Sequence, residues 1–494
     1  MNKLQSWLLS VLLVACLLSS CNNGGDAKVK SEVKTTEITV STKSKEAAAA
    51  FQQGLAAYDL NDIKKARAAF NEAIKLDPAL GIAYLYRANT STTSKEFADD
   101  VNAGNAKIDS AGNWEKMYGE YMRTNLAGDR NGGLAILEKI AAAFPDAARA
   151  QNDLGNGYSG NNQFSKAREQ FQKAVQLDPK WIGGYSSLVG AYLFTDPKDL
   201  KKAEENALKL VELAPASAGT QIALGDCYRA QNDMQKAKDA YTKAVTLDAT
   251  APEGLYKLGH ANTFLGNYDE ARKNYAAAGI NDVTPSGAAL NSAYSYLYQD
   301  NAKAAMDVLM AAAAKADSSK ANEKLNYYAT CANIAVHNGD AAALKKLVPM
   351  ILPLSEKINN DLGTAEAKPF IAAEKENWAA LTAYVDGKYD EAKAKAEAMK
   401  TALDPVKDDR KLENYHQIMG LISMKQKNYA EAVGHFEKSD PNNIYNKYWQ
   451  AMANEAAGNK DKATALYKEV AAYNFNDVGN ALVRNEVKKK LGTP

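Results

Sequence analysis

Residues able to do chemistry are few in this sequence, and the first candidate is a glycine-rich segment. Gly155–Gly160 reads Gly-Asn-Gly-Tyr-Ser-Gly, which matches the Gly-x-Gly-x-x-Gly pattern of dinucleotide-binding loops. That chemistry needs a preceding strand, a following helix and an acidic residue about 20 positions further on. These glycines instead lie at the end of an expected helix and in the turn after it. We therefore expect no cofactor there.

Histidines and acidic pairs are the remaining candidates for metal binding or acid–base chemistry. The four histidines form no His-x-x-x-His group, and two of them without a third ligand make a poor zinc site. Asp99-Asp100 and Asp408-Asp409 are interpreted as solvated turn residues. No nucleophile elbow, metalloprotease helix or phosphate loop is present. We expect no metal site and no catalytic residues; the histidines are His260, His337, His416 and His435.

The elements that must carry these residues repeat along the chain. Leu-Gly pairs at Gly155, Gly225 and Gly259 are each followed by an alanine and then an aromatic residue, as in Ala167 and Phe171. Gly225 and Gly259 are 34 residues apart, and Gly155 and Gly225 are 70 apart, which is two periods and an insertion of two. A period of this length predicts a solenoid of helix pairs. A lone pair cannot bury its apolar face, so the pairs must stack.

The repeated pattern resembles a known family. Leu-Gly-x-x-Tyr, then Ala-x-x-x-Phe, then Pro179 is similar to the tetratricopeptide repeat in register. The resemblance implies an all-α, right-handed superhelical solenoid. We expect about twelve helix pairs, with a polar capping helix over Asn480–Leu491 that ends the array.

The array is expected to fall into two parts. Residues 46–354 form an N-terminal stack in which the segment 81–145 holds two degenerate repeats. Residues 355–372 depart from the consensus and either extend a helix or form a loop, which makes them a possible break. Regular repeats return over residues 373–494.

The first 45 residues differ from the rest. Residues 1–21 have a basic start, a short apolar stretch and small residues before Cys21, as in a signal peptide. Leu18-Ser19-Ser20-Cys21 resembles the lipobox of bacterial lipoproteins, which implies lipidation of Cys21 and a place in the bacterial cell envelope. An ordinary secretory signal or a buried helix is the alternative. Asn22-Asn23 lacks the aspartate that retains some lipoproteins in the inner membrane, which favours the outer one. Residues 22–45 cannot bury enough apolar surface to fold and are expected to be a disordered tether.

Charge and cysteine content exclude further classes. Lys and Arg number 60 against 59 Asp and Glu, so the chain has no global basic field and nucleic acid is not expected as a partner. Cys227 and Cys331 are about three repeats apart, too far for an intrachain disulfide in an array where each repeat touches its neighbours. They are interpreted as small buried hydrophobes.

The concave surface is the remaining candidate site. In tetratricopeptide domains the second, fifth, ninth and twelfth positions of each first helix face it. Asn152 and Asn156 resemble part of the carboxylate clamp of chaperone-binding members, but the following repeats supply Ser187, Gly219 and Ala223 where that clamp needs amide and basic groups. We expect this surface to grip an extended peptide or a helix. The register gives Tyr118, Met122, Arg149, Asn152, Asn156, Ser159, Ile222, Asp226, Arg229, Tyr256, His260 and Tyr294.

Three functions are compatible with these features. The first is a lipid-anchored envelope scaffold that binds a protein or peptide partner through the concave groove. The second is a glycan- or nutrient-capturing surface lipoprotein built on tetratricopeptide helices. The third is an enzyme such as a repeat-bearing glycosyltransferase, which is disfavoured because about twelve repeats leave no residues for a catalytic domain.

Overall fold

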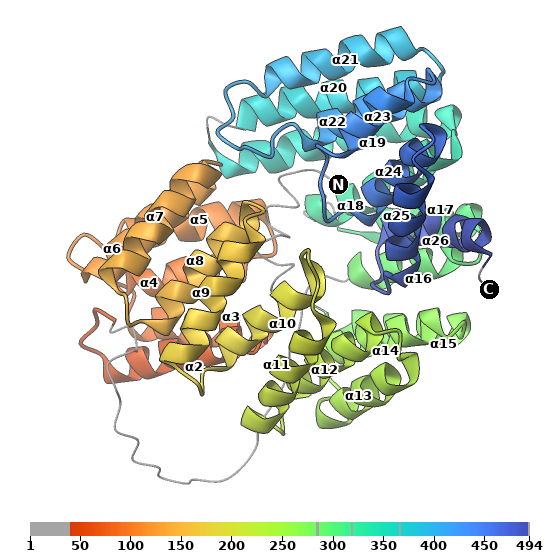
Figure 1. The fold of residues 1–494 in the computed structure, drawn as a ribbon. Helices are drawn as coiled ribbons and strands as arrows, with labels where there is room; N and C mark the ends of the chain where they lie inside the picture. The colour runs from red at the N-terminus through yellow and green to blue at the C-terminus, as the bar shows by residue number, and fades with distance from the viewer. Residues whose placement is uncertain (1–39, 283–285, 318–319, 365–366, 493–494) are drawn as a thin grey trace. The chain divides into compact units, whose positions relative to one another are not determined.

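A computed structural model describes residues 40–282, 286–317, 320–364 and 367–492 of the chain. Over these residues every regular element is an α-helix, and α2 to α26 form twelve successive pairs followed by one last helix (Figure 1). The predicted all-α, tetratricopeptide-like fold is confirmed. None of these described helices is both long enough and apolar enough to cross a membrane.

The two helices of each pair have distinct roles in the array. The first helices, whose shared side we call the first-helix face, are α2 (Lys45–Asp59), α4 (Gly81–Ala88), α6 (Asn113–Leu126), α8 (Ala148–Gly160), α10 (Ile182–Phe194), α12 (Ala218–Ala230), α14 (Pro252–Phe264), α16 (Ser286–Leu297), α18 (Ala321–Asn338), α20 (Ala367–Val385), α22 (Glu413–Lys425) and α24 (Ile444–Ala456). The second helices are α3 (Ile63–Leu76), α5 (Ser94–Asn105), α7 (Arg130–Ala143), α9 (Phe164–Leu177), α11 (Leu200–Leu213), α13 (Met234–Leu247), α15 (Tyr268–Asn281), α17 (Ala302–Lys315), α19 (Ala341–Leu362), α21 (Tyr389–Ala402), α23 (Tyr429–Phe436) and α25 (Lys460–Ala472). The last helix is α26 (Val478–Leu491).

The described residues form two compact units that divide within α14, between Leu258 and Gly259. We call them the N-terminal unit and the C-terminal unit. The segment expected to hold a break behaves partly as a helix: α19 continues to Leu362 and ends at Gly363, whose φ of 66° is left-handed. Of the two alternatives for this segment, the structure has the helix, which extends through residues 355–362. The two units divide within α14 and not in this segment.

One contact defines the packing of the regular pairs. The first helix carries a glycine, and the ring of an aromatic residue 16 positions later on the second helix lies against it. A Cβ added at Gly155 would stand 2.4 Å from the ring of Phe171, and one at Gly225 would stand 2.4 Å from the ring of Tyr241. A side chain larger than hydrogen does not fit there without a shift of the ring. The same contact recurs between Gly54 and Phe70, Gly259 and Tyr275, and Gly420 and Phe436.

Ten of the twelve described pairs turn through a residue with positive φ, and the pairs α4–α5 and α10–α11 do not. Asn162 and Gly266, in the turns expected from the sequence, have φ of 58° and 80°. Asparagine and glycine tolerate this conformation best. The next residues often cap the second helix: the carboxylate of Asp233 accepts a hydrogen bond from the backbone N–H of Lys236 at 3.1 Å.

The end of the expected tether is part of the folded body. Residues 40–44 are described, and the hydroxyl of Ser41 contacts the carboxylate of Glu115 at the start of α6 and accepts a hydrogen bond from the N–H of Gly112 at 2.9 Å. Thr42 donates to Asp77 at 2.5 Å. The prediction of disorder up to residue 45 is wrong for residues 40–45. Ser41 satisfies a backbone N–H at the start of α6, and Thr42 binds Asp77 at the end of α3. Residues 22–39 and Cys21 lie outside the described residues.

Candidate partner-binding surface

The first-helix face of the N-terminal unit carries a group of aromatic and charged side chains that we call the tyrosine–acid cluster. Its members come from the ends of α2, from α4, α6 and α8, and from the residue before α10. Most are half-buried, so that part of each side chain reaches the surface. The cluster comprises Tyr58, Asp59, Tyr86, Tyr118, Tyr121, Arg149, Asp153 and Trp181.

One acid of the cluster is fully paired. Asp59 Oδ2 accepts hydrogen bonds from Arg149 Nη2 at 2.6 Å and from Trp181 Nε1 at 2.7 Å. The guanidinium of Arg149 also lies over the Trp181 ring, 5.1 Å from its centroid. Burial works against the charge of Arg149, but Asp59 more than offsets it and holds the pKa of this group above its ordinary value. These contacts tie the end of α2 to α8 and to the start of α10.

The second acid, Asp153, is not paired in this way. It lies one helical turn after Arg149 on α8, and it makes no hydrogen bond to any residue that the structure describes. Burial raises the pKa of this carboxyl to about 7; Arg149 opposes the rise, and the negative charge of Asp59 adds to it. Asp153 therefore changes its charge near neutral pH.

Four tyrosine rings of the cluster pack against one another, and the charge of Asp153 acts on all four. Tyr86 stacks on Tyr118 with centroids 4.8 Å apart, and Tyr58 and Tyr121 meet these two rings at 6.3 and 5.7 Å. Burial, then the charge of Asp153, raises the pKa of Tyr58 above its ordinary value. Burial also raises the pKa of Tyr121 to about 12. The hydroxyl of Tyr86 is buried and has no hydrogen-bond partner among the described residues.

The predicted asparagine pair lies beside the tyrosine–acid cluster. Asn152 is 7% exposed and Asn156 is half-buried, and the side-chain oxygen of each is shielded without a hydrogen-bond partner in the described chain. Ser159, one turn further on, is also half-buried. Arg149, Asn152 and Asn156 thus lie on α8, with Arg149 and Asn156 half-buried and Asn152 buried.

Seven predicted residues are more buried than their register suggested, and besides Asn152 they are Tyr118, Met122, Ile222, Asp226, Arg229 and Tyr256. Tyr118 is held in the core by Tyr86 and by a hydrogen bond from Asn89 at 2.9 Å, and Tyr256 is 8% exposed. Met122 and Ile222 are also core residues, with exposed fractions of 1% and 0%. Asp226 is fully enclosed.

Asp226 belongs to a buried ionic network instead of a solvent-facing surface. Its carboxylate accepts hydrogen bonds from Arg229 at 2.9 Å, from Lys257 at 3.0 Å and from the hydroxyl of Tyr241 at 2.5 Å. Arg229 is 1% exposed. The expectation that Asp226 and Arg229 face solvent is wrong, because the neighbouring first helix α14 delivers Lys257 onto them.

In the C-terminal unit the predicted residues lie under the chain's own end. His260 Nε2 is 3.1 Å from the side-chain oxygen of Asn291, which also accepts a hydrogen bond from Asn476 at 2.9 Å. Tyr294 is half-buried, and burial together with the charge of Asp477 raises its pKa above the ordinary value.

The last helix extends this coverage. α26 packs against the first helices α16, α18 and α24 as well as the second helix α25. Asn485 donates to the carbonyl of Tyr298 at 3.0 Å, and Arg484 lies 4.9 Å from the centroid of the Phe264 ring. Val483 and Val487 are fully buried. The helix expected as a polar cap at the end of the array therefore also covers the first-helix face of this unit.

The histidines and cysteines of the described residues lie apart from the tyrosine–acid cluster. His416 and His435 stand 3.0 Å apart through their Nδ1 atoms, yet no group of three or more His, Cys, Asp and Glu side chains arranged for a metal occurs in the described ranges. Cys227 and Cys331 are buried free thiols. Burial raises the pKa of Cys331 to about 12, so it is inert as a nucleophile at neutral pH.

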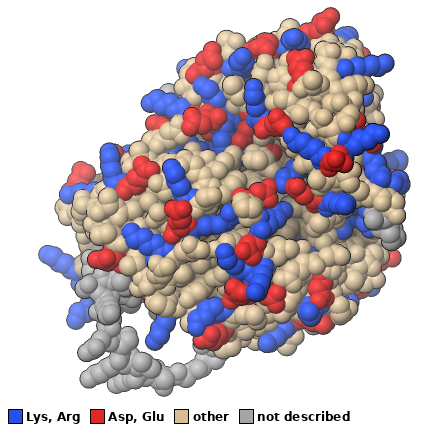
Figure 2. All heavy atoms as spheres, in the orientation of Figure 1, with Lys and Arg blue, Asp and Glu red and all other residues tan. Residues whose placement is uncertain are grey.

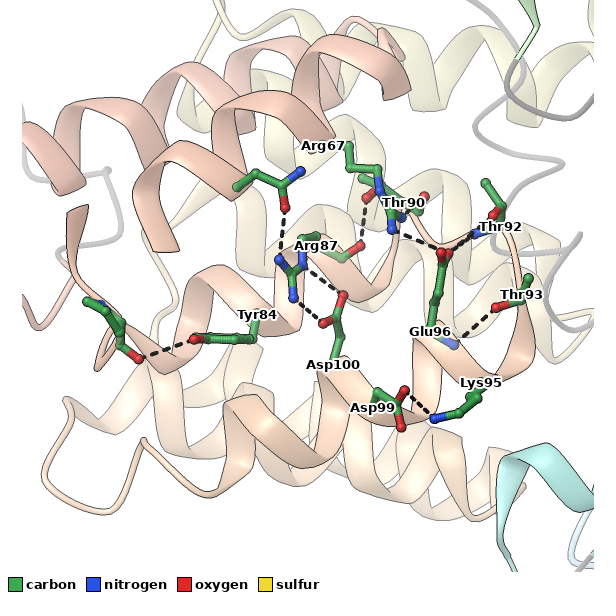
Figure 3. A network of polar contacts seen from close by, with 12 residues as sticks. Arg67, Tyr84, Arg87, Thr90, Thr92, Thr93, Lys95, Glu96, Asp99 and Asp100 are labelled. Atoms are coloured by element: carbon green, nitrogen blue, oxygen red, sulfur yellow. Dashed lines mark hydrogen bonds and ion pairs between the residues drawn. The ribbon is translucent and has the colours of Figure 1, made fainter. Parts of the chain in front are cut away.

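Other polar contacts hold the degenerate repeats together. Arg87 on α4 donates to both carboxylate oxygens of Asp100 on α5, at 3.0 and 2.5 Å, and to Asn71 on α3 at 2.8 Å (Figure 3). Arg67 on α3 donates to the carbonyl of Thr90 at 2.9 Å. Asp100 is 6% exposed and lies within a helix, so its interpretation as a solvated turn residue is wrong. This network is structural.

Comparison with known proteins agrees with the helix pairs. A tetratricopeptide repeat model matches residues 47–80 and 148–181, and a second matches residues 218–250 and 252–278. The chain contains tetratricopeptide repeats. Anaphase-promoting complex subunit 3 of Schizosaccharomyces pombe is 25% identical over 147 residues, which are 30% of this chain and 22% of that protein. The match thus spans about a fifth of that relative's length.

Several solved tetratricopeptide structures are similar in part. The crystal structure of MamA is 24% identical, covers 32% of this chain and 91% of its own, and has a TM-score of 0.28. YrrB, described as a tetratricopeptide protein with an unusual peptide-binding site, is 21% identical over 35% of this chain and 88% of its own, with a TM-score of 0.26. The anaphase-promoting complex hetero-tetramer Cut9-Hcn1 is 15% identical, covers 87% of this chain and 78% of its own, and has a TM-score of 0.38.

Proposed function

We propose that this chain is a non-enzymatic scaffold of a bacterial envelope, anchored through a lipid on Cys21, that binds a protein partner through the first-helix face of its N-terminal unit. Stacked helix pairs of this kind present extended surfaces on which peptides and helices bind. Figure 2 supports a protein partner, because positive and negative side chains are interspersed on the face it displays.

The proposal rests on a difference between the first-helix faces of the two units. In the C-terminal unit the chain's own last helix lies on α16, α18 and α24. In the N-terminal unit Arg149, Asp153 and Asn156 on α8 are partly exposed, and the carboxylate of Asp153 receives no hydrogen bond from a described residue. Unsatisfied polar atoms in a half-buried position favour a partner that completes their hydrogen bonds.

The envelope location rests on the sequence. Leu18-Ser19-Ser20-Cys21 follows an apolar leader, and a polar segment follows the cysteine. A lipidated N-terminus holds a chain at a membrane without a spanning helix. We expect Cys21→Ala to release the protein from the membrane fraction with its helicity intact. A variant that still sediments quantitatively with membranes contradicts the anchor.

The binding surface is tested by affinity capture from detergent-solubilised envelopes, followed by mass spectrometry. A chain with Asn152→Ala and Asn156→Ala should lose its captured protein while keeping its melting temperature, because the removed oxygens make no hydrogen bond in the described structure. The control carries Lys173→Ala and Lys243→Ala, exposed positions on the second helices α9 and α13, and should capture normally. Loss of capture in the control alone moves the binding surface to the second helices.

A further inference from the structure

The charges of the tyrosine–acid cluster do not balance. It holds two carboxylates, Asp59 and Asp153, and Arg149 is the one described cation that acts on Asp153. Arg149 is committed to Asp59 at 2.6 Å. Two repeats further on, Asp226 and Glu253 face Arg229 and Lys257, so that network has one cation for each acid. The tyrosine–acid cluster is short of one positive charge.

The tyrosine–acid cluster also lacks hydrogen-bond donors for its acceptor oxygens. The oxygens of Asp153, Asn152 and Asn156 lie within one turn of α8, and within the described residues none of these oxygens receives a hydrogen bond. The hydroxyl of Tyr86, a residue only 2% exposed, is a further polar group without a partner there. A ligand that completes this group must bring donors. An ammonium group brings three donors and no acceptor, and a guanidinium brings five.

The rings around Asp153 suit a cation as well. Tyr58 and Tyr121 are half-buried and stand at the edge of the stack formed by Tyr86 and Tyr118. Tyrosine faces attract ammonium and guanidinium groups within about 6 Å. The same surface already holds one such pair, because Arg149 lies 5.1 Å from the centroid of the Trp181 ring.

We propose that the partner places a basic side chain, lysine or arginine, against the half-buried carboxylate of Asp153 and beside the rings of Tyr58 and Tyr121. This inference deepens the proposed function and depends on it, since it names the chemistry of the group that the first-helix face receives. A metal ion is a poorer occupant, because no group of three metal-ligating side chains occurs in the described parts of the chain.

The site is tested on the full chain with small probes of one size. n-Butylammonium imitates a lysine side chain, and 1-butanol is its neutral counterpart. In protein carrying ¹³C-labelled tyrosine, n-butylammonium should shift the ring signals of Tyr58 and Tyr121, identified by Tyr→Phe variants, and 1-butanol should not. Calcium chloride serves as a probe of the metal alone. Equal shifts with 1-butanol, or binding of calcium in preference to n-butylammonium, overturn the proposal.

The residue that carries the charge is tested by a matched pair of variants. Asp153→Asn keeps the shape of the side chain and should weaken n-butylammonium binding at least tenfold. Asp146→Asn removes the same charge from the exposed loop before α8 and should leave binding unchanged. Unchanged binding by Asp153→Asn, in protein whose circular dichroism matches the wild type, overturns the proposal.

The pH dependence of n-butylammonium binding is a second test of the same site. Arg149, Asp59 and the four tyrosines are the groups that act on Asp153, and Asp153 is the one among them that titrates near neutrality. With its pKa at about 7, the ionised fraction rises about tenfold between pH 6 and pH 8, and affinity for n-butylammonium should rise with it. Affinity that does not change with pH contradicts the assignment.

The captured protein separates this inference from the proposed function. Asp153→Asn should lose the protein that the wild-type chain captures from envelopes, and Asp146→Asn should keep it. If Asp153→Asn captures that protein as well as the wild type does, the basic side chain is not the recognised group, and the scaffold function stands. If the wild type captures nothing that the Asn152→Ala and Asn156→Ala variant loses, the scaffold function fails.

Discussion

The first-helix face differs between the N-terminal unit and the C-terminal unit. In the C-terminal unit α26 packs on the first helices α16, α18 and α24, and some polar side chains there, such as Asn291, bind other parts of the chain. In the N-terminal unit the face around Asp153 keeps an unpaired acid and acceptors without donors in the described residues. The register of a repeat therefore tells which side chains share a face, but a distant segment decides whether that face is free for a partner.

The largest expected effect comes from removing the cover. A chain that ends at Phe475 lacks the buried Val483 and Val487, and each such side chain contributes about 1.5–3 kcal/mol. We expect the C-terminal unit to lose roughly 5 kcal/mol of stability. Hydrogen exchange should accelerate in α16, α18 and α24 and stay slow in α2 to α13. A uniform acceleration in both units would show that α26 has no particular partner.

A second prediction concerns the filled part of the N-terminal unit. Asp226→Ala removes the carboxylate that Arg229 and Lys257 share, leaves Glu253 as the acid beside Lys257, and should destabilise the unit by about 3–5 kcal/mol in urea unfolding. Asp239→Ala, an exposed position on the next helix, should change stability by about 0.5 kcal/mol or less. Near-equal effects of the two changes would contradict the burial of Asp226.

Removing the charge of Asp153 should raise the stability of the N-terminal unit, whereas removing the charge of Asp226 lowers it. Asp153 has a folded pKa of about 7, above the value of about 3.9 expected in the unfolded chain. The folded state therefore binds more protons between these values, and stability falls as pH rises through this window. Asp153→Asn should stabilise the protein by about 1–3 kcal/mol at pH 8 and by about a third of that at pH 5, where the unfolded carboxyl is ionised and the folded one is not. Urea unfolding at both pH values measures this, and an equal effect at both contradicts it.

The smallest expected effect tests how the cover is held. Asn476→Ala removes the hydrogen bond to Asn291 and should cost about 1 kcal/mol. Exchange of the amides of residues 474–485 should accelerate while α20 to α23 stay protected. Asn442→Ala, an exposed turn position, is the control and should change neither.

Local sequence patterns predicted most of the fold, because they report contacts within a pair. The glycine at the eighth position and the aromatic residue 16 positions later meet directly, as Gly225 and Tyr241 do. The period predicts the number of helix pairs, even over the repeats whose sequence departs from the pattern. In α6 and α7 the glycine position is taken by Tyr121 and the aromatic position by Leu137. Gly133, in the position of Ala167, leaves room for the Tyr121 ring, which would lie 3.7 Å from a Cβ added there.

The candidate site was only partly predictable. The register identified Arg149, Asn152 and Asn156, but it did not include Asp153, although the spacing of four residues from Arg149 places both on one side of α8. Burial of Asp226 could not be read from its own helix, because Lys257 comes from the next repeat. The cover of the C-terminal unit depends on contacts such as that of Asn485 with Tyr298, 187 residues apart, which no local period reports.

The return of α26 onto α16 also affects the order in which the protein can assemble. A stack with neighbour contacts alone can grow pair by pair as each one leaves the ribosome or a translocation channel. The C-terminal unit cannot, because its early helix α16 is not covered until α26 has been made. Contacts between such distant residues slow folding. We expect the N-terminal unit to become resistant to protease first, and the C-terminal unit to follow in one step once α26 has emerged.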